Sequence, residues 1–187
     1  IGSFSETSRL QLDSFNESMK INRIDKIWNE KEYIGYLNIS GGVNRLKSIL
    51  SKQVDENILR KIHYDKTKIF QQKILKSRSL IRPGFEQLCK ELIANNILLG
   101  LASTTSLQTI ENILLGLKSI KISDFSFIAH SGTVNKQKPD PQVYNICLKE
   151  LSVQELESVA FEDTTLSLKS VLSAGIKGIA IPGNLSL

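Results

Sequence analysis

The chain has 187 residues, of which 41% are hydrophobic and 23% are charged, and its formal net charge is +5. This length allows one hydrophobic core, or a core with a small inserted lobe, and the modest positive charge without a dense basic block favours an anionic small substrate over a nucleic acid. Because no apolar run approaches membrane-spanning length and the N-terminus lacks a signal-peptide pattern, we expect a protein of the cytoplasm, or of a plastid or other organelle stroma, that binds no membrane.

Residues 1–80 are predicted to form an all-helical lobe. The first two helices repeat apolar side chains at helical spacing, and these are Leu12, Phe15 and Met19 in the first and Tyr33, Tyr36 and Leu37 in the second. After the break at Gly41-Gly42, a third helix is expected from about Val43 to Leu50 and a fourth from about Asn57 to Leu75. No segment of this lobe has the pattern of a strand.

Residues 81–187 are predicted to form an α/β core, because helices and short strands alternate after Arg82-Pro83-Gly84. Such alternation is typical of right-handed βαβ crossovers and therefore of a Rossmann-like parallel sheet. The expected strands are Ile97–Ala102, Phe127–Ala129, a strand that ends at Phe161, and Gly178–Ile181. Cys89 and Cys147 lie on apolar helix faces without metal-ligand spacing, and we expect them to be buried thiols.

Polar side chains follow two of these strands. Ser103, Thr104 and Thr105 stand between the first strand and a helix, where hydroxyl and backbone N–H groups can hold a phosphate. For such a segment alone, ordinary helix capping is the favoured alternative. Lys138 precedes a helix that is expected to open at Pro139, so it can place a cation at the carboxyl end of the sheet, although a solvated loop lysine is the simpler interpretation.

Two adjacent carboxylates, Glu162 and Asp163, directly follow the third strand. Open α/β sheets bind their ligands at the carboxyl ends of their strands, and paired carboxylates suit Mg²⁺ and, through it, a phosphate. The alternative is an acid pair that favours the start of the next helix through the helix dipole. That helix carries its apolar residues at Leu168, Val171 and Leu172.

The core resembles the haloacid dehalogenase (HAD) superfamily in the order of three motifs. Its second motif matches Ser103, its third matches Lys138 in Lys-Pro-Asp-Pro, and its fourth matches Glu162-Asp163. Its phosphatases and phosphomutases work through an aspartyl-phosphate. The lobe is similar to the helical cap of CbbY-like phosphatases and β-phosphoglucomutase, on the basis of Ser5-Glu6-Thr7, Gly41-Gly42-Val43-Asn44-Arg45 and His63-Tyr64-Asp65-Lys66-Thr67. The resemblance implies an α/β HAD fold with a cap, and a phosphatase of a small sugar phosphate such as the pentulose bisphosphate xylulose 1,5-bisphosphate.

The same resemblance implies roles for the matched residues. Ser103 and Lys138 would be catalytic, since they would stabilise charge on the transferred phosphoryl group. Glu162 and Asp163 would hold the cofactor Mg²⁺. The residues expected to bind the substrate are Thr7, Arg45, Lys66, Thr104 and Thr105. Without the motif, solvent-facing charge would be the favoured interpretation of Arg45 and Lys66.

The family's first motif, Asp-x-Asp-Gly-Thr-Leu, is where the sequence departs from the pattern. Ile1 stands at the second Asp, the nucleophilic Asp would precede Ile1, and Gln11 replaces a common His. We therefore expect a fragment that is incomplete at both ends and inactive as it stands. Because the strand before this motif is central in the family's sheet, its absence would expose two unpaired strand edges.

Three functions remain open at this point. The first is the Mg²⁺-dependent sugar phosphatase, which an Asp-x-Asp encoded upstream of Ile1 would support. The second is a non-catalytic HAD-fold protein that binds a phosphorylated metabolite or a protein partner, which Ile1 and Gln11 favour. The third is a phosphomutase, which needs the acid/base Asp that Ile1 replaces. A monomer is expected in each case.

Overall fold

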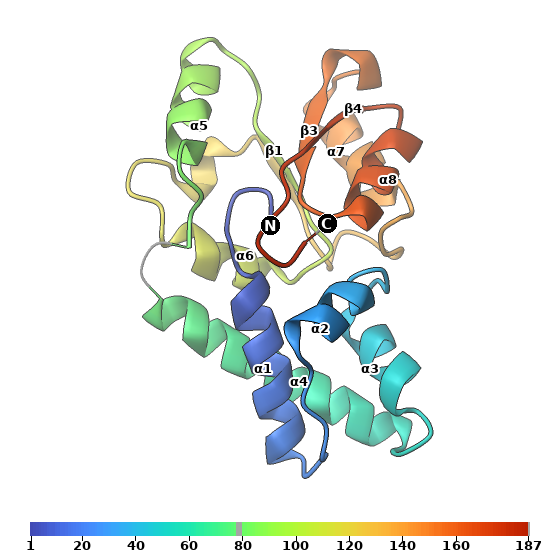
Figure 1. Ribbon diagram of the computed structural model, residues 1–187. Coiled ribbons are helices and arrows are strands. Elements are labelled where there is room, and N and C mark those ends of the chain that lie inside the picture. The colour runs from blue at the N-terminus through green and yellow to red at the C-terminus, as the bar shows by residue number, and fades with distance from the viewer. Residues whose placement is uncertain (78–79, 187) are drawn as a thin grey trace.

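The computed structural model describes residues 1–77 and 80–186 and places a helical lobe below an α/β lobe (Figure 1). The helical lobe contains α1 (Ser8–Ile21), α2 (Glu30–Tyr36), α3 (Gly42–Leu50) and α4 (Glu56–Lys76). The α/β lobe contains α5 (Phe85–Ala94), β1 (Gly100–Ala102), α6 (Leu107–Leu114), β2 (Phe127–Ala129), α7 (Gln142–Leu151), β3 (Val159–Glu162), α8 (Thr165–Ser173) and β4 (Lys177–Ala180), with short 3₁₀ turns at Ile122–Asp124 and Glu155–Glu157. No helix among the described residues is both long and apolar enough to cross a bilayer.

The helical lobe has its own apolar core, as the helical spacing predicts. Leu12, Phe15 and Met19 of α1 are buried against Leu46 of α3 and Ile62 of α4. Burial of such side chains contributes roughly 1.5–3 kcal/mol each and fixes the angle at which the helices pack. The lobe is therefore a firm support for the polar residues that α1, α3 and α4 present at its upper end.

Two chain segments join the lobes, and they pair with each other. The amide of Glu6 donates to the carbonyl of Leu80 at 2.7 Å, and the amide of Arg82 donates to the carbonyl of Phe4 at 2.9 Å. Ser5 and Ile81 thus form an isolated antiparallel bridge, in a region where the sequence predicts no extended pairing. The predicted boundary between residues 80 and 81 falls within this paired connection.

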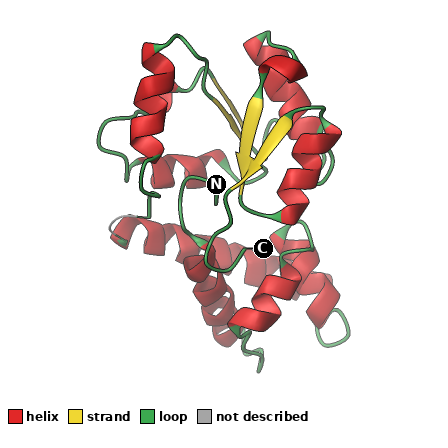
Figure 2. Cartoon of the chain, turned by 45° about the horizontal axis from the view of Figure 1, so that its top comes forward, coloured by secondary structure: helices red, strands yellow, loops and turns green. Residues whose placement is uncertain are grey.

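The strands form two parallel pairs. β1 pairs with β2, so that Leu101 is opposite Ile128, and β3 pairs with β4, so that Phe161 is opposite Ile179. The parallel direction agrees with the predicted βαβ alternation. α7 packs against β1 and β2, and α8, which connects β3 to β4, packs against both of those strands. Among the described residues no strand joins β1 to β3, so the sheet is divided (Figure 2). This division is the pair of unpaired edges that the sequence leads us to expect.

Three local predictions are wrong. α7 begins at Gln142 rather than Pro139, because Pro141 disfavours helical backbone at the residue before it. The carboxylate of Asp140 accepts the Gln142 amide at 3.0 Å just ahead of the helix. The first strand begins at Gly100, because Ile97 has no strand partner among the described residues and is 51% exposed. Leu172 is 60% exposed, since Val171 and Ser170 are the α8 residues buried in the core.

Candidate active site

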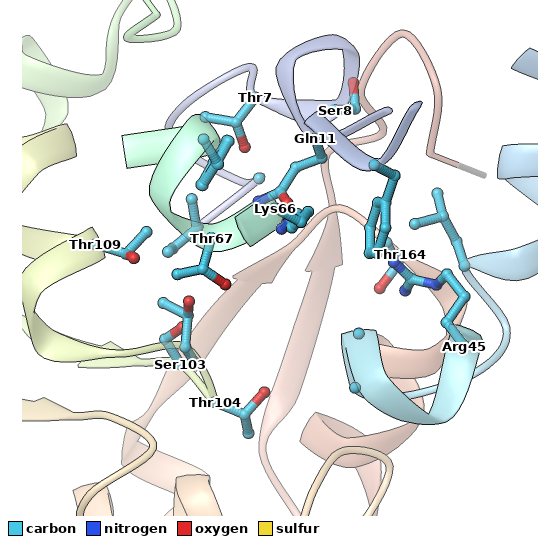
Figure 3. Close-up of a pocket in the computed structure, with 18 of the residues that line it drawn as sticks. Thr7, Ser8, Gln11, Arg45, Lys66, Thr67, Ser103, Thr104, Thr109 and Thr164 are labelled. Carbon is cyan, nitrogen blue, oxygen red and sulfur yellow. Dashed lines mark hydrogen bonds between the residues drawn. The ribbon is translucent and has the colours of Figure 1, made fainter. Parts of the chain in front are cut away.

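A cavity of about 590 Å³ lies between the helical lobe and the carboxyl ends of β1 and β3 (Figure 3). Seven of the nine predicted site residues line it, and these are Thr7, Arg45, Lys66, Ser103, Thr104, Thr105 and Asp163. The other two, Lys138 and Glu162, lie outside its lining and contact each other. The fold therefore brings together side chains that are far apart in the sequence.

The Ser103 loop connects β1 to α6 on one side of the cavity. Ser106 is the N-cap of α6, because its hydroxyl accepts the amide of Thr109. Helix capping is therefore the role of Ser106, and the capping alternative is wrong for Ser103. The Ser103 hydroxyl instead accepts the Thr105 amide at 3.2 Å, which folds the loop back on itself at the start of α6. Hydroxyls and backbone N–H groups at this end of a helix suit an anion.

Lys138 belongs to a buried network rather than to a solvated loop, so the simpler interpretation of this lysine is wrong. Its side chain is only 8% exposed, and its Nζ donates to the Ala102 carbonyl at 3.3 Å, to the Tyr144 hydroxyl at 2.9 Å and to Glu162 Oε1 at 2.5 Å. The Tyr144 hydroxyl in turn donates to Glu162. The sequence pattern missed Tyr144, because its place on the apolar face of α7 gives no sign of a polar contact.

Electrostatics distinguish Glu162 from Asp163. Burial raises the pKa of Glu162, but the Lys138 ammonium opposes it, and that pKa lies below its usual value. Burial and, less strongly, the neighbouring Glu162 raise the pKa of Asp163. Glu162 ends β3, and α8 has no acid in its first turn, so the helix-start alternative is wrong. Asp163 is the partly buried carboxylate that lines the cavity.

The acid pair fits part of a Mg²⁺ site. A magnesium ion takes oxygen ligands and keeps several waters, so Asp163 in the cavity can supply one of its six ligands, whereas Oε1 of Glu162 is already bonded to Lys138 and Tyr144. No third His, Cys, Asp or Glu joins them in a ligand cluster within residues 1–77 and 80–186. A cation beside Asp163 would stabilise its ionised form, which burial disfavours.

On the cap side, Lys66 and Arg45 reach the same cavity (Figure 3). Lys66 is 8% exposed, its Nζ donates to Gln11 and lies 4.8 Å from the ring centre of Phe15, and burial, followed by repulsion from Arg45, lowers its pKa to about 7. Arg45 donates to the carbonyl of Tyr36 at 2.9 Å. Lys66 is buried, so its interpretation as solvent-facing charge is wrong. Neither Lys66 nor Arg45 forms an ion pair with a carboxylate of the described residues, so an anionic ligand would compensate both charges.

His63 is a residue of the cap that the sequence pattern did not assign. Burial, with repulsion from Lys66 and Arg45, lowers its pKa to about 4. It is therefore neutral at physiological pH and lines the cavity without adding charge. The lowered pKa of His63 cannot be predicted from the composition of the sequence, because it arises from neighbours on α3 and α4.

Comparison with known proteins gives consistent matches. The family model for haloacid dehalogenase-like hydrolases matches residues 2–181. Protein CbbY of Cereibacter sphaeroides is 31% identical over 97% of this chain and 81% of its own length. The crystal structure of CbbY from Rhodobacter sphaeroides in complex with phosphate has a TM-score of 0.90 at 30% identity and covers 100% of this chain and 84% of its own. A mutant of that CbbY in complex with xylulose-(1,5)bisphosphate gives a TM-score of 0.88 at 30% identity, over 98% and 83% of the two chains.

Proposed function

Because the chain belongs to the haloacid dehalogenase-like hydrolases, we propose that its cavity is the substrate site of a Mg²⁺-dependent, CbbY-like phosphatase for a small sugar bisphosphate. The observation that carries this proposal is the presence of two anion-binding groups in one cavity. The Ser103 loop lies at the sheet, and Arg45 with Lys66 lies on the cap. The complexes of the R. sphaeroides relative with phosphate and with xylulose-(1,5)bisphosphate support this choice of ligand.

In this proposal the residues divide the work between two phosphates. The phosphate to be transferred binds at the Ser103 loop, where the Ser103 hydroxyl and the backbone N–H groups stabilise its charge. Mg²⁺, held by Asp163 with Glu162, would neutralise phosphoryl oxygens when it is bound. Lys138 and Tyr144 fix the Glu162 carboxylate from behind. Arg45 and Lys66 bind the far phosphate, and Thr7, Thr104 and Thr105 offer hydroxyls to the sugar.

We further propose that the 187-residue chain binds this ligand without turning it over. Asp163 and Glu6 are the carboxylates that line the cavity among the described residues. Glu6 is committed to Arg82 at 3.2 Å and to the Asn184 amide at 3.0 Å, so it is not free to attack a phosphate. An aspartyl-phosphate mechanism needs a free carboxylate nucleophile beside the metal.

The expected result with the purified 187-residue chain is therefore no phosphate release from xylulose 1,5-bisphosphate above the no-enzyme rate, with or without Mg²⁺. A malachite green assay measures this, and a calorimetric titration of the same sample shows that the ligand binds. Mg²⁺-dependent turnover that Asp163→Asn abolishes would contradict the proposed lack of activity. Absence of binding would contradict the proposed site itself, including the non-catalytic alternative of a metabolite-binding protein.

Arg45 tests the assignment of the far phosphate. Removing a hydrogen-bonding charge costs about 1.5–3 kcal/mol, so Arg45→Met should weaken binding of xylulose 1,5-bisphosphate about 10–100-fold. Affinity for inorganic phosphate, which binds at the Ser103 loop, should stay within about two-fold. The matched control is Arg60→Met on α4, whose side chain is 65% exposed and pairs with Glu56. An equal loss of affinity for both ligands would contradict this assignment, because it would mean that Arg45 contacts the phosphate bound at the Ser103 loop.

A further inference from the structure

Gln11 has no role in the proposed function, although it lines the same cavity as Arg45 and Lys66 (Figure 3). It lies one turn after Thr7 on α1, where its amide donates to the Thr7 carbonyl at 2.9 Å. Its side-chain oxygen Oε1 accepts a hydrogen bond from Lys66 Nζ on α4. A lysine ammonium only donates, so the carboxamide must present its oxygen rather than its nitrogen to Lys66. This contact joins α1 to α4 at the wall of the cavity.

The other neighbours of Lys66 Nζ leave its hydrogen-bonding capacity open. Nζ lies 4.8 Å from the ring centres of both Phe15 and Phe70, whose faces attract a cation but do not replace a hydrogen-bonding oxygen. Within residues 1–77 and 80–186, Gln11 is the one hydrogen-bond acceptor of Nζ. An ammonium has three N–H donors, so two of them remain for a ligand.

The charged groups around Lys66 favour an anionic ligand over a fixed protein partner. Arg45 of α3 repels Lys66, and His63 of α4 is neutral at physiological pH because its pKa is lowered to about 4. Glu6 and Asp163 line the cavity, but in the described part of the chain neither forms an ion pair with Lys66. A carboxylate in contact with Lys66 would compete with an anion for it. The carboxamide oxygen stabilises the ammonium and leaves its charge uncompensated.

We propose that Gln11 is a positioning residue, which holds the Lys66 ammonium in the cavity through a neutral oxygen and so keeps its charge available to an anionic ligand. This inference rests on the proposed anion-binding function of the cavity. Burial, followed by repulsion from Arg45, lowers the pKa of Lys66 to about 7. A single hydrogen bond to the charged form therefore decides how much of Lys66 is charged at neutral pH. Gln11 thus extends the pH range over which the cavity binds an anion.

The titration of the Lys66 amine tests this role without any ligand. The readout is the ¹³Cε signal of Lys66 in a chain with ¹³C-labelled lysine, assigned as the signal that Lys66→Met removes. Gln11→Leu should lower the midpoint of the titration by about one pH unit, because it removes an acceptor from the charged form. Gln11→Glu should raise the midpoint, because a carboxylate favours the ammonium. The matched control is Gln72→Leu, at an exposed position of α4, which should leave the midpoint unchanged. An unchanged midpoint in Gln11→Leu would overturn the inference.

Calorimetric titration of xylulose 1,5-bisphosphate gives the second readout. Phosphate groups themselves titrate near pH 6, so each variant is compared with the wild type at the same pH. Gln11→Leu should weaken binding about 10-fold at pH 8 but only about two-fold at pH 6, where about half of its Lys66 is still charged. Gln11→Glu should weaken binding at pH 6 as well, since its carboxylate competes for Lys66.

The two readouts separate this inference from the proposed function. An equal loss of affinity by Gln11→Leu at pH 6 and pH 8 would mean that Gln11 only supports the packing of α1, and would overturn its positioning role. A wild-type chain that does not bind xylulose 1,5-bisphosphate would contradict the proposed function instead, and the midpoint of the Lys66 titration would then test Gln11 by itself.

Discussion

Replacing Lys138 by methionine should lower the free energy of unfolding by about 3–5 kcal/mol, because it leaves the Glu162 carboxylate buried without its cation. Glu162 is 4% exposed, so water cannot take the place of Lys138. Urea denaturation followed by circular dichroism measures the change. The matched control is Lys136→Met, because Lys136 pairs with Asp140 at 3.2 Å on the surface with 66% of its side chain exposed. That variant should change stability by no more than about 1 kcal/mol.

The ion pair between Lys138 and Glu162 should also make the stability of the chain depend on pH. The pKa of Glu162 lies below its usual value in the folded chain, so its contribution to stability is present above the unfolded pKa of about 4.3 and is lost as the pH falls through the folded pKa. Lys138→Met should weaken this acid-dependent loss. The double variant Lys138→Met, Glu162→Gln should recover most of the stability, since it removes the uncompensated charge. If the double variant is as unstable as the sum of the single ones, the two side chains do not act as a pair.

Replacing Lys66 by methionine should make the chain more stable, in contrast to Lys138→Met, and should still weaken ligand binding. Because burial lowers the pKa of Lys66 to about 7, the unfolded chain binds more protons than the folded chain between pH 7 and the unfolded pKa. Stability of the wild-type chain should therefore rise with pH over that range. Lys66→Met should remove this slope and raise the free energy of unfolding at pH 7 by about 2–4 kcal/mol, while it weakens binding of xylulose 1,5-bisphosphate at least ~10-fold.

Lys68→Met provides the control for that substitution. Lys68 lies on the same helix, is exposed and contacts the ring of Tyr64 at 4.6 Å. Its removal should leave stability within about 0.5 kcal/mol and ligand affinity unchanged. A Lys66→Met chain that is less stable than the wild type at pH 7 would mean that a partner already compensates the Lys66 charge, and the anion-binding role of the cap would then lose its physical basis.

Local patterns in the sequence predict the regular secondary structure of this fold. Helical spacing locates α1 to α4 and the buried face of α1, and the alternation of helices and strands predicts parallel pairing. Motif order also locates Ser103 and Asp163 at one cavity. These predictions succeed because an amphipathic helix face or a strand end is determined by residues that are close together in the sequence.

Features that depend on distant neighbours could not be predicted in the same way. Tyr144 occupies an apolar helix position, and only the approach of Lys138 and Glu162 makes its hydroxyl part of a polar network. Lys66 and His63 have ordinary side chains whose pKa values change because the cap buries them beside Arg45. The sequence likewise cannot show that Lys138 and Glu162 lie behind the cavity rather than in it.

The central claim, that one cavity holds the two phosphates of a sugar bisphosphate in unequal surroundings, can be measured by ³¹P NMR. Mn²⁺ suits the same oxygen ligands as Mg²⁺ and broadens signals of nearby phosphorus atoms. Adding substoichiometric Mn²⁺ to xylulose 1,5-bisphosphate with the 187-residue chain should broaden one phosphorus signal, that of the phosphate near Asp163, much more than the other near Arg45. Asp163→Asn should abolish the difference. Equal broadening of both signals in the wild-type chain, or none beyond that of free ligand, would contradict the account.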